Sequence, residues 1–373
     1  MFLALKELLH SKTRFSMIAV ILVLISWLVL ILSGLGNGLA TLAAATFKTM
    51  KADYVVFEQG SRASMSKSLL SNELSASLAD MPNVEAVAPM GIVMASAVKE
   101  NGDSGENKTD IALVGIEPGS FLEPAVIEGE GLKADQPALV IANESLKDEG
   151  FRIGDTLQLD GSPAQLTIAG FVENQTYNHV ASVFLPIDEW RKIAFAAPGS
   201  DKGLAEPVNA IMLQGKKIDP NAIDERLTGT ETVTRAAAVQ GIPGYKEESG
   251  TIMMMLGFLL VISAFIVGAF FYVFTIQKSN QFGIMKAIGA KNGFLSRAVV
   301  AQVFLLSLGS VIVGILLTYG TAAVLPEGMP FILEPLRVLA YSVAMLVVSL
   351  LSALVSVRTI VKIDPLKALG RVE

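Results

Sequence analysis

The apolar residues of the chain gather in four long blocks that contain no charged side chain. The blocks are Phe15–Leu35, Ile252–Phe274, Ala298–Leu325 and Val338–Val357. Each is about 20 residues or longer, the length that a helix needs to cross the hydrocarbon core of a bilayer. Because backbone polar groups must be paired inside lipid, we expect four transmembrane helices. The predicted spans are residues 15–45, 248–280, 297–325 and 337–360.

A cleaved signal peptide is the alternative for the first block, since Lys6, Lys12 and Arg14 precede it and small residues occupy Ala43–Ala45. The apolar stretch is too long for the central region of a signal peptide. We therefore interpret it as a retained membrane helix.

The segment of residues 46–247 is polar and large enough to hold a core of its own. Alternation of apolar and polar positions at 52–57 and around the turn at 161–163 predicts strands, while 220–227 fits a short helix. The predicted fold class is therefore membrane α-helical, with an α+β extracytoplasmic domain inserted between helices 1 and 2. The remaining predicted parts are an N-terminal amphipathic segment 1–14, a coupling segment 281–296, an external hairpin 326–336 and a C-terminal segment 361–373.

Charge is distributed unevenly, and this fixes the expected orientation. Residues 48–247 contain 17 Lys and Arg against 29 Asp and Glu, whereas the rest of the chain has 12 basic and 6 acidic residues. Short basic segments stay in the cytoplasm. We therefore expect a multi-pass protein of the plasma membrane with both termini and the coupling segment inside. The acidic domain then lies outside.

Several classes of function lack the residues that they need. The chain has no cysteine and only two histidines, so thiolate chemistry and a multi-histidine metal site are disfavoured. No Gly-x-x-x-x-Gly-Lys-Ser/Thr motif is present, so a separate polypeptide must bind any ATP that drives the protein. The membrane blocks carry no ionisable residue, which disfavours an ion-coupled transporter. No arrangement of residues supports an enzyme, and nothing indicates nucleic-acid binding.

Two segments carry a resemblance to a known family. Phe271–Lys278 with Gln281–Ala290, and the ending Lys362–Leu369, resemble motifs of the MacB/FtsX/LolC superfamily of ABC transporter permeases, which have the type VII fold. The order of one helix, a large external domain and three helices is similar along the whole chain. The resemblance implies a homodimer in the lipid bilayer with two copies of an ABC ATPase subunit. It also implies a helix that leaves the bilayer and turns at a glycine.

Within this superfamily the chain most resembles permeases that export heme, through Ala269–Lys278 and Tyr177-Asn178-His179. The resemblance implies heme as the transported substrate and no intrinsic cofactor. Two alternatives stay open. One is efflux of another amphiphile, such as a peptide, macrolide or lipid. The other is FtsX-like signalling to a cell-wall hydrolase without transport.

Heme would need axial ligands for its iron, cations for its propionates and aromatic contacts for its ring. Tyr245, Glu248 and Met255 are the candidate iron ligands at the start of the second membrane helix. Glu248 and Met255 are seven residues apart, so they return to nearly the same helix face. The further heme-binding candidates are Met254, Tyr177, His179, Phe47 and Lys48. The alternative interpretations are packing methionines, interfacial anchors and a surface histidine.

The coupling segment is expected to dock on the ATPase through Phe282, Gly283, Ile284, Met285, Lys286 and Gly289. Apolar Phe282, Ile284, Met285 and Ile288 are predicted to form one helix face. A basic loop on anionic lipid is the alternative. In the first membrane helix, Gly34 and Gly38 have the Gly-x-x-x-Gly spacing of close helix packing. This packing would serve either a dimer or the four-helix bundle.

Overall fold

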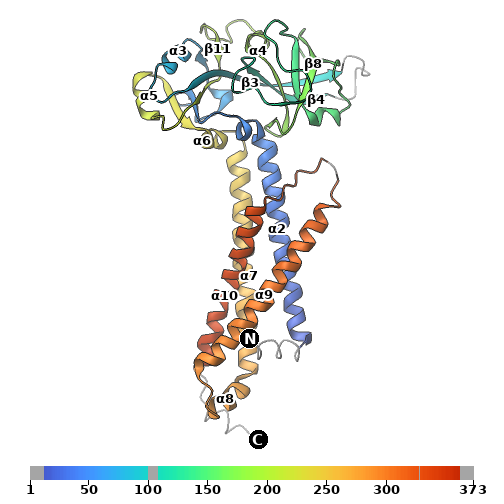
Figure 1. Ribbon diagram of the computed structural model, residues 1–373, viewed down its shortest axis with the longest axis vertical. Helices are drawn as coiled ribbons and strands as arrows, with labels where there is room; N and C mark the ends of the chain where they lie inside the picture. The colour runs from blue at the N-terminus through green and yellow to red at the C-terminus, as the bar shows by residue number, and fades with distance from the viewer. Residues whose placement is uncertain (1–11, 100–107, 327, 362–373) are drawn as a thin grey trace. The chain divides into compact units, whose positions relative to one another are not determined.

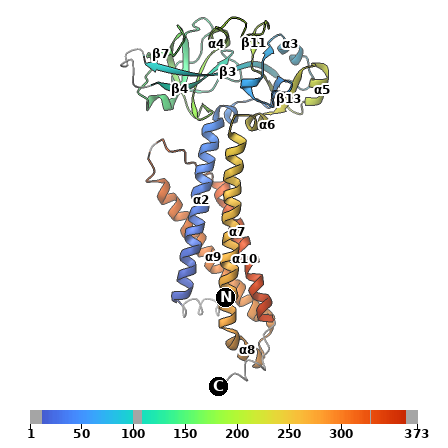
Figure 2. The same ribbon diagram turned by 180° about the vertical axis from the view of Figure 1, so that it is seen from behind.

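A computed structural model describes residues 12–99, 108–326 and 328–361. Its contacts divide the chain into a helical unit, Met1–Gly38 with Ser249–Glu373, and an inserted unit, Leu39–Glu248. Figures 1 and 2 show the elements of both units from opposite sides. Most of the predicted N-terminal segment and the C-terminal motif Lys362–Leu369 lie outside the described residues.

Four helices of the described chain are long and apolar enough to cross a membrane. Their bounds are α2 Lys12–Thr49, α7 Tyr245–Gln277, α9 Asn292–Ala322 and α10 Pro335–Val361. A shorter helix, α8 Ser279–Ala287, follows α7. The predicted class of four membrane helices with an inserted domain is confirmed.

Phenylalanines form the centre of one end of the helical unit. Phe15 on α2 contacts Phe274 on α7 edge to face, with ring centroids 5.0 Å apart, and Phe270 and Phe271 extend the cluster. Edge-to-face geometry adds to the stabilisation that comes from close packing. The buried ring of Phe282 joins the same cluster, so α8 is anchored to the bundle by its own side chain.

Gly34 and Gly38 pack against a loop and not against another helix. A Cβ on Gly38 would lie 2.1 Å from the carbonyl oxygen of Pro330, and one on Gly34 would lie 2.5 Å from the ring of Phe331. The N–H of Ile332 also donates to the carbonyl of Gly34 at 3.1 Å. The chain between α9 and α10 therefore packs on this surface of α2.

The inserted unit is built on one large mixed sheet. Among the described residues it has the order β13-β1-β12-β3-β4-β10-β6-β8-β5, with β7 and β9 paired at its side. The strands are β1 Tyr54–Glu58, β3 Ala86–Lys99, β4 Thr109–Ile116, β5 Val126–Gly129, β6 Leu139–Asn143, β7 Thr156–Leu159, β8 Gln165–Val172, β9 Thr176–Tyr177, β10 Val180–Pro186, β12 Ala210–Gln214 and β13 Thr230–Thr234. The other elements are the paired β2 Leu70–Ser71 and β11 Pro207–Val208, the helices α3 Leu74–Ala79, α4 Ile187–Ala194, α5 Pro220–Arg226 and α6 Arg235–Gln240, and the 3-10 turns η1 Met65–Lys67 and η2 Glu144–Lys147.

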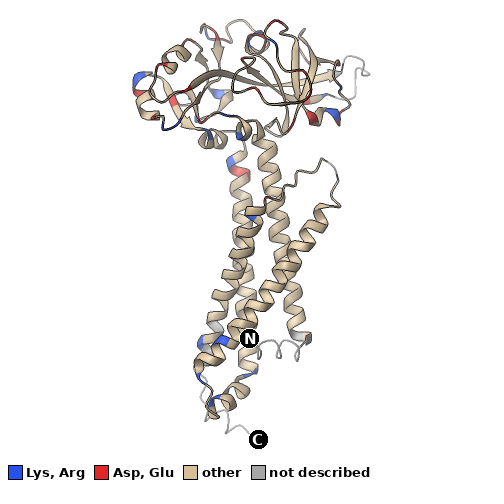
Figure 3. Cartoon of the chain, in the orientation of Figure 1, with Lys and Arg blue, Asp and Glu red and all other residues tan. Residues whose placement is uncertain are grey.

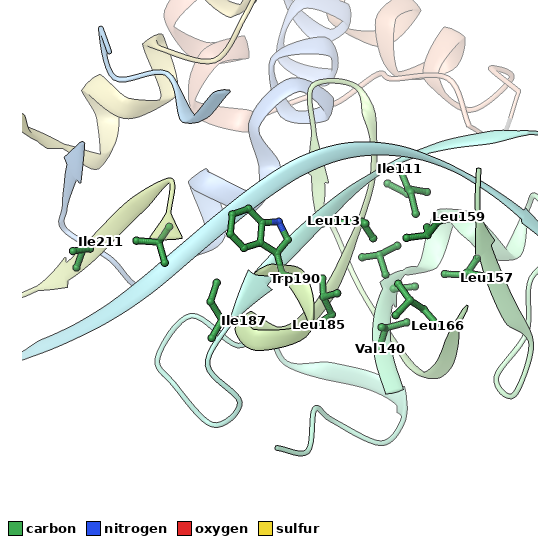
Figure 4. Packing of buried hydrophobic residues seen from close by; sticks show 14 of the residues in the cluster. Ile111, Leu113, Val140, Leu157, Leu159, Leu166, Leu185, Ile187, Trp190 and Ile211 are labelled. Carbon is green, nitrogen blue, oxygen red and sulfur yellow. The ribbon is translucent and has the colours of Figure 1, made fainter. Parts of the chain in front are cut away.

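Most strand pairs are antiparallel, as predicted, but β10 pairs with β4 and β6 pairs with β8 in parallel. Figure 4 shows the core on one face of the sheet, with Trp190 and Ile187 of α4 beside Leu185 and Leu113. The β7–β8 pair confirms the hairpin predicted from alternation around its turn. The sheet thus supplies a rigid base on which the connecting turns are held.

Candidate functional site

The first turn of α7 follows a left-handed glycine, Gly244, and contains two glutamates. Gly244 has a φ of +79°, a left-handed conformation that turns the chain into the helix. The N–H of Glu248 then donates to the carbonyl of Gly244 at 2.9 Å. Glu247 and Glu248 lie in this turn, where the helix dipole favours negative charge. Tyr245 and Glu248 are therefore placed on an ordered turn.

His179 and Glu248 are brought together within the inserted unit. His179 Nε2 lies 3.3 Å from Glu248 Oε2, and both side chains remain partly exposed. His179 sits in the tight turn between β9 and β10, where it and Asn178 both have positive φ. Imidazole and carboxylate at this distance form an ion pair whenever the histidine is protonated. Two candidate heme-binding residues from separate segments, His179 and Glu248, are therefore in contact.

The β9–β10 turn is held against a break in α2. Ala44 has non-helical angles, φ −143° and ψ 16°, inside the helix. Such a break leaves the carbonyls of the preceding turn without their usual helical donors. Four other groups supply donors: Lys48 Nζ to Ala40 O (2.7 Å), Thr176 Oγ1 to Thr41 O (3.3 Å), His179 N to Leu42 O (3.2 Å) and Asn178 N to Ala43 O (2.8 Å).

Lys48 and Tyr245 form a second pair. Lys48 Nζ lies 5.4 Å from the centroid of the Tyr245 ring, a cation–π distance. Both line an open cavity of about 440 Å³ together with Asp53 and Arg235. One nitrogen of Arg235 donates to the carbonyls of Lys48 and Met50 at 2.9 and 2.6 Å. No local pattern marks Arg235 in the sequence, so it was missed there.

Phe47 and Tyr177 belong to the core. Their ring centroids are 5.9 Å apart and both side chains are buried. Burial raises the pKa of the Tyr177 phenol to about 12, so the phenol is neutral at physiological pH. Protein atoms cover both rings in this structure, and their contact with a ligand stays a prediction. A local strand pattern could not reveal that the β9–β10 turn folds onto α2.

The methionine triplet at the start of the membrane part of α7 is exposed. Met253, Met254 and Met255 have exposed fractions of 71%, 57% and 45% in the chain alone. They belong to the helical unit. These side chains therefore lie outside the core of the helical unit in the described chain. Groups of three or more His, Asp or Glu that could hold a metal ion are absent from the described ranges.

The coupling segment folds as α8, and one prediction about it is wrong. Phe282 is buried and Met285 packs beside it, whereas Ile284 and Ile288 are exposed. Positions 282 and 284 are about 160° apart the shorter way around a helix, and their different burial places them on different sides of α8. The segment presents two apolar faces, one toward the bundle and one outward.

Gly283 does not make the turn that the resemblance implied. It is buried inside α8, and the change of direction occurs at Lys278 between α7 and α8. Gly289 ends α8 with φ +101°. The N–H groups of Gly289 and Ala290 donate to the carbonyls of Lys286 and Met285, which is a Schellman cap. Gly289 therefore supplies the left-handed residue that stops the helix.

Lys286 connects α8 to the end of α10. Its Nζ donates to the carbonyl of Val361 at 3.2 Å. Partial burial lowers the pKa of Lys286 from its ordinary value. A cation at a helix C-terminus also interacts favourably with the helix dipole. The coupling helix and the last membrane helix are thus linked by a polar contact as well as by the aromatic cluster.

Two family profiles cover most of the chain. The one described as MacB-like periplasmic core domain matches residues 15–230, and the one described as FtsX-like permease C-terminal matches residues 253–365. The chain belongs to the MacB/FtsX-like family of ABC transporter permeases. Permease components of this family are not enzymes. The four spans and the periplasmic-type domain of this MacB/FtsX-like permease fit a protein of the plasma membrane.

Curated relatives of this MacB/FtsX-like permease match it end to end. The hemin transport system permease protein HrtB of Staphylococcus haemolyticus is 28% identical over 371 residues, covering 100% of this chain and 99% of the relative. An uncharacterized ABC transporter permease of Mycobacterium tuberculosis is 26% identical and covers 99% of both. The solved periplasmic region of MacB from Actinobacillus actinomycetemcomitans aligns with 52% of this chain and 94% of its own, at 13% identity and a TM-score of 0.37.

Proposed function

We propose that the chain is the permease subunit of an ATP-driven exporter that removes heme from the membrane. The full-length similarity to a hemin transport permease is the observation that carries this proposal. The exposed methionines of α7 support it, because thioethers are ligands of heme iron. Heme is the transported substrate, and the chain needs no cofactor of its own.

The proposed site lies at the external start of α7. Met255 and Glu248 are two turns apart on this helix, so they lie on nearly the same side of it. Met255, Glu248 and Tyr245 are the proposed iron ligands, with Met254 as an alternative thioether. Lys48 and Arg235 line the cavity beside Tyr245 and supply cations for the propionates. His179, which was also predicted from the sequence, is a further candidate because it lies beside Glu248.

A separate ABC ATPase subunit is proposed to hydrolyse the ATP, with two copies bound to a homodimer of this chain. Ile284 and Ile288 give α8 an exposed apolar surface that an ATPase subunit could cover. The buried Phe282 and the Lys286 contact to α10 would pass its movement to the bundle. Export then follows from the different affinity of two conformations for the cargo.

Hemin titration of the purified full-length chain in nanodiscs tests the cargo. The wild-type chain is expected to shift the Soret band with saturable binding. Met255→Ala and Glu248→Gln should each weaken hemin affinity at least about tenfold, because an axial ligand is lost. Met253→Ala is the matched control, since this neighbouring methionine lies on another side of α7.

A chain that gives no Soret shift contradicts heme as the cargo. Specific export of a peptide, macrolide or lipid by the complex would then support the rival amphiphile. Binding of an external cell-wall hydrolase without any transport would support a signalling role.

Reconstitution with the ATPase subunit tests the coupling surface. The double variant Ile284→Ala with Ile288→Ala should lose most of the ATPase binding, because it removes the outward apolar face of α8. Gln281→Ala on the same exposed helix is the control. Equal binding by both variants would rule out this face as the docking surface.

A further inference from the structure

A second cavity lies inside the inserted unit, apart from the residues proposed to bind heme. It has a volume of about 350 Å³ and is only partly open. Cavities of about 300–1,000 Å³ are the usual size of small-molecule sites. None of Tyr245, Glu248 and His179 lines it. The cavity therefore requires an explanation of its own.

Apolar side chains from the sheet form its floor. Met90 of β3, Ile116 of β4 and Phe184 of β10 line it and are buried in the second core cluster of the unit. Leu122 and Met50 close the sides. Methionine adapts its shape to a partner, and phenylalanine offers a flat apolar face. The floor thus suits the apolar body of a small molecule.

One wall is the last turn of α2, beyond the break at Ala44. Thr46 and Thr49 line the cavity, and Gln175 Nε2 donates to Thr49 Oγ1 at 3.0 Å. Thr46 and Ser182 share a hydrogen bond of 2.9 Å. These polar groups are held by one another, so the wall is a built surface and not a loose gap. A molecule in the cavity would touch the turn that leads out of the first membrane helix.

The mouth carries charges of both signs. Lys51 and Glu173 line the cavity and are exposed. Glu123 also lines it, but its carboxylate accepts the N–H groups of Gly119 and Leu132 at 2.6 and 3.0 Å. One ammonium and two carboxylates leave the lining with a net negative charge, so the mouth disfavours an anion. The side-chain amides of Asn174 and Gln175 also line the cavity, and they donate to Glu173 and Thr49.

We propose that this cavity binds a small amphiphile whose polar head carries no negative charge. The apolar body lies on Met90, Ile116 and Phe184, and the head lies between Lys51 and Glu173. This site does not depend on heme being the cargo.

The absence of cysteine in the chain gives a direct test. Ala125→Cys places one thiol at the exposed edge of the cavity. Its alkylation by a maleimide is followed by mass spectrometry on the full-length chain in nanodiscs, with and without N-phenyl-1-naphthylamine. At ten times its Kd the probe should slow alkylation about tenfold, since only the empty site reacts. Ala197→Cys, exposed elsewhere in the inserted unit, is the control and should keep its rate.

The head-charge part is tested with 8-anilino-1-naphthalenesulfonate, which has a similar aromatic body and a sulfonate. This anion should give much weaker protection of Ala125→Cys. An unchanged rate with the neutral probe, equal slowing at Ala197→Cys, or equal protection by the anion would each overturn the proposal. A hemin titration is unaffected by any of these outcomes, so the two proposals fail separately.

Discussion

Two glycines make room for the largest side chain in the core of the inserted unit. Gly91 of β3 and Gly115 of β4 are direct partners in the sheet. A Cβ on Gly91 would lie 2.3 Å from the indole of Trp190, and one on Gly115 would lie 2.5 Å from the same side chain. The two glycines therefore form a slot for the Trp190 indole, and any larger residue at either position would fill it.

Gly115→Ala is expected to destabilise the inserted unit by about 1–3 kcal/mol, because the buried indole has nowhere to move. Met94→Ala on β3 removes an exposed side chain and should change the free energy of unfolding much less. Chemical denaturation of both variants measures the difference. Equal stabilities would show that the slot is not filled as described.

Tyr177 predicts a pH dependence at the alkaline side. Its pKa is raised by burial from 10.0 to about 12, so the folded state keeps the phenol neutral where an unfolded chain ionises it. This contribution is complete below pH 10 and is lost as pH rises from 10 toward 12, at most about 2.7 kcal/mol. Tyr177→Phe should flatten the fall in stability over this window. A fall of the same steepness in both proteins would contradict the placement of Tyr177.

Among the elements, α2 is the one whose shape depends most on distant residues. Its break at Ala44 is stabilised by donors from Lys48 and from the β9–β10 turn. A straight helix would satisfy the same carbonyls internally, so releasing this turn would permit α2 to straighten. The β9–β10 turn therefore stabilises the break in α2. Substitutions at its positive-φ residues, Asn178 and His179, are expected to weaken it.

Two substitutions of His179 separate the contribution of its backbone conformation to stability from that of its side chain. His179→Gly removes the imidazole but tolerates φ +68°, and should cost below about 1 kcal/mol for the partly exposed pair with Glu248. His179→Ala removes the same imidazole and adds left-handed strain, so it should be about 1 kcal/mol less stable than His179→Gly. Thermal unfolding compares them. If glycine were the less stable of the two, backbone strain would not control the turn.

The contact between α2 and the loop before α10 depends on the absence of a side chain. Gly38→Ala should destabilise the helical unit by about 1–3 kcal/mol, because the added carbon meets the Pro330 carbonyl. Gly320→Ala in α9 has open space around it and should stabilise its helix by up to about 1 kcal/mol. Opposite signs in thermal unfolding are the expected result. The same sign for both would mean that the loop does not rest on Gly38.

Elements with local signals could be predicted from sequence, while contacts between distant segments could not. Uncharged runs reveal the membrane helices, and alternation reveals the β7–β8 hairpin. The partner of Gly34 and Gly38 is nearly 300 residues away, so the spacing alone could not show that it is a loop. The four apolar residues of the coupling segment fall within about 160° of a helix, so spacing alone could not show that Phe282 is buried while Ile284 is exposed.

The same limit applies to the candidate site. Helical spacing placed Glu248 and Met255 correctly along one helix, whereas the burial of Phe47 and Tyr177 follows from a turn that folds back onto α2. Arg235 and the Lys48–Tyr245 contact arise from tertiary structure and leave no mark in the local sequence.

For the molecule as a whole, charge is the feature that predicts orientation. In Figure 3 most of the blue positions of the helical unit, which mark Lys and Arg, lie in and near α8, whereas Arg337 lies at the start of α10. This arrangement supports a cytoplasmic α8 and an outward inserted unit. The prediction can be tested because the chain has no cysteine to interfere.

In intact cells, Ala197→Cys should react with a membrane-impermeant maleimide. Gly293→Cys, exposed at the start of α9, should react only after the membrane is opened. Both residues are exposed, so the difference reports the side of the membrane and not burial. The reverse pattern would invert the topology and remove α8 from reach of a cytoplasmic ATPase.

The chain has two tryptophans, and they lie in different units. Trp27 donates to Thr321 Oγ1 at 3.1 Å in the helical unit, while Trp190 is sealed in its glycine slot in the inserted unit. Each unit therefore carries its own intrinsic fluorophore. Trp27→Phe leaves emission from the inserted unit alone, and Trp190→Phe leaves that of the helical unit, so the melting of the two parts can be recorded separately without an added dye.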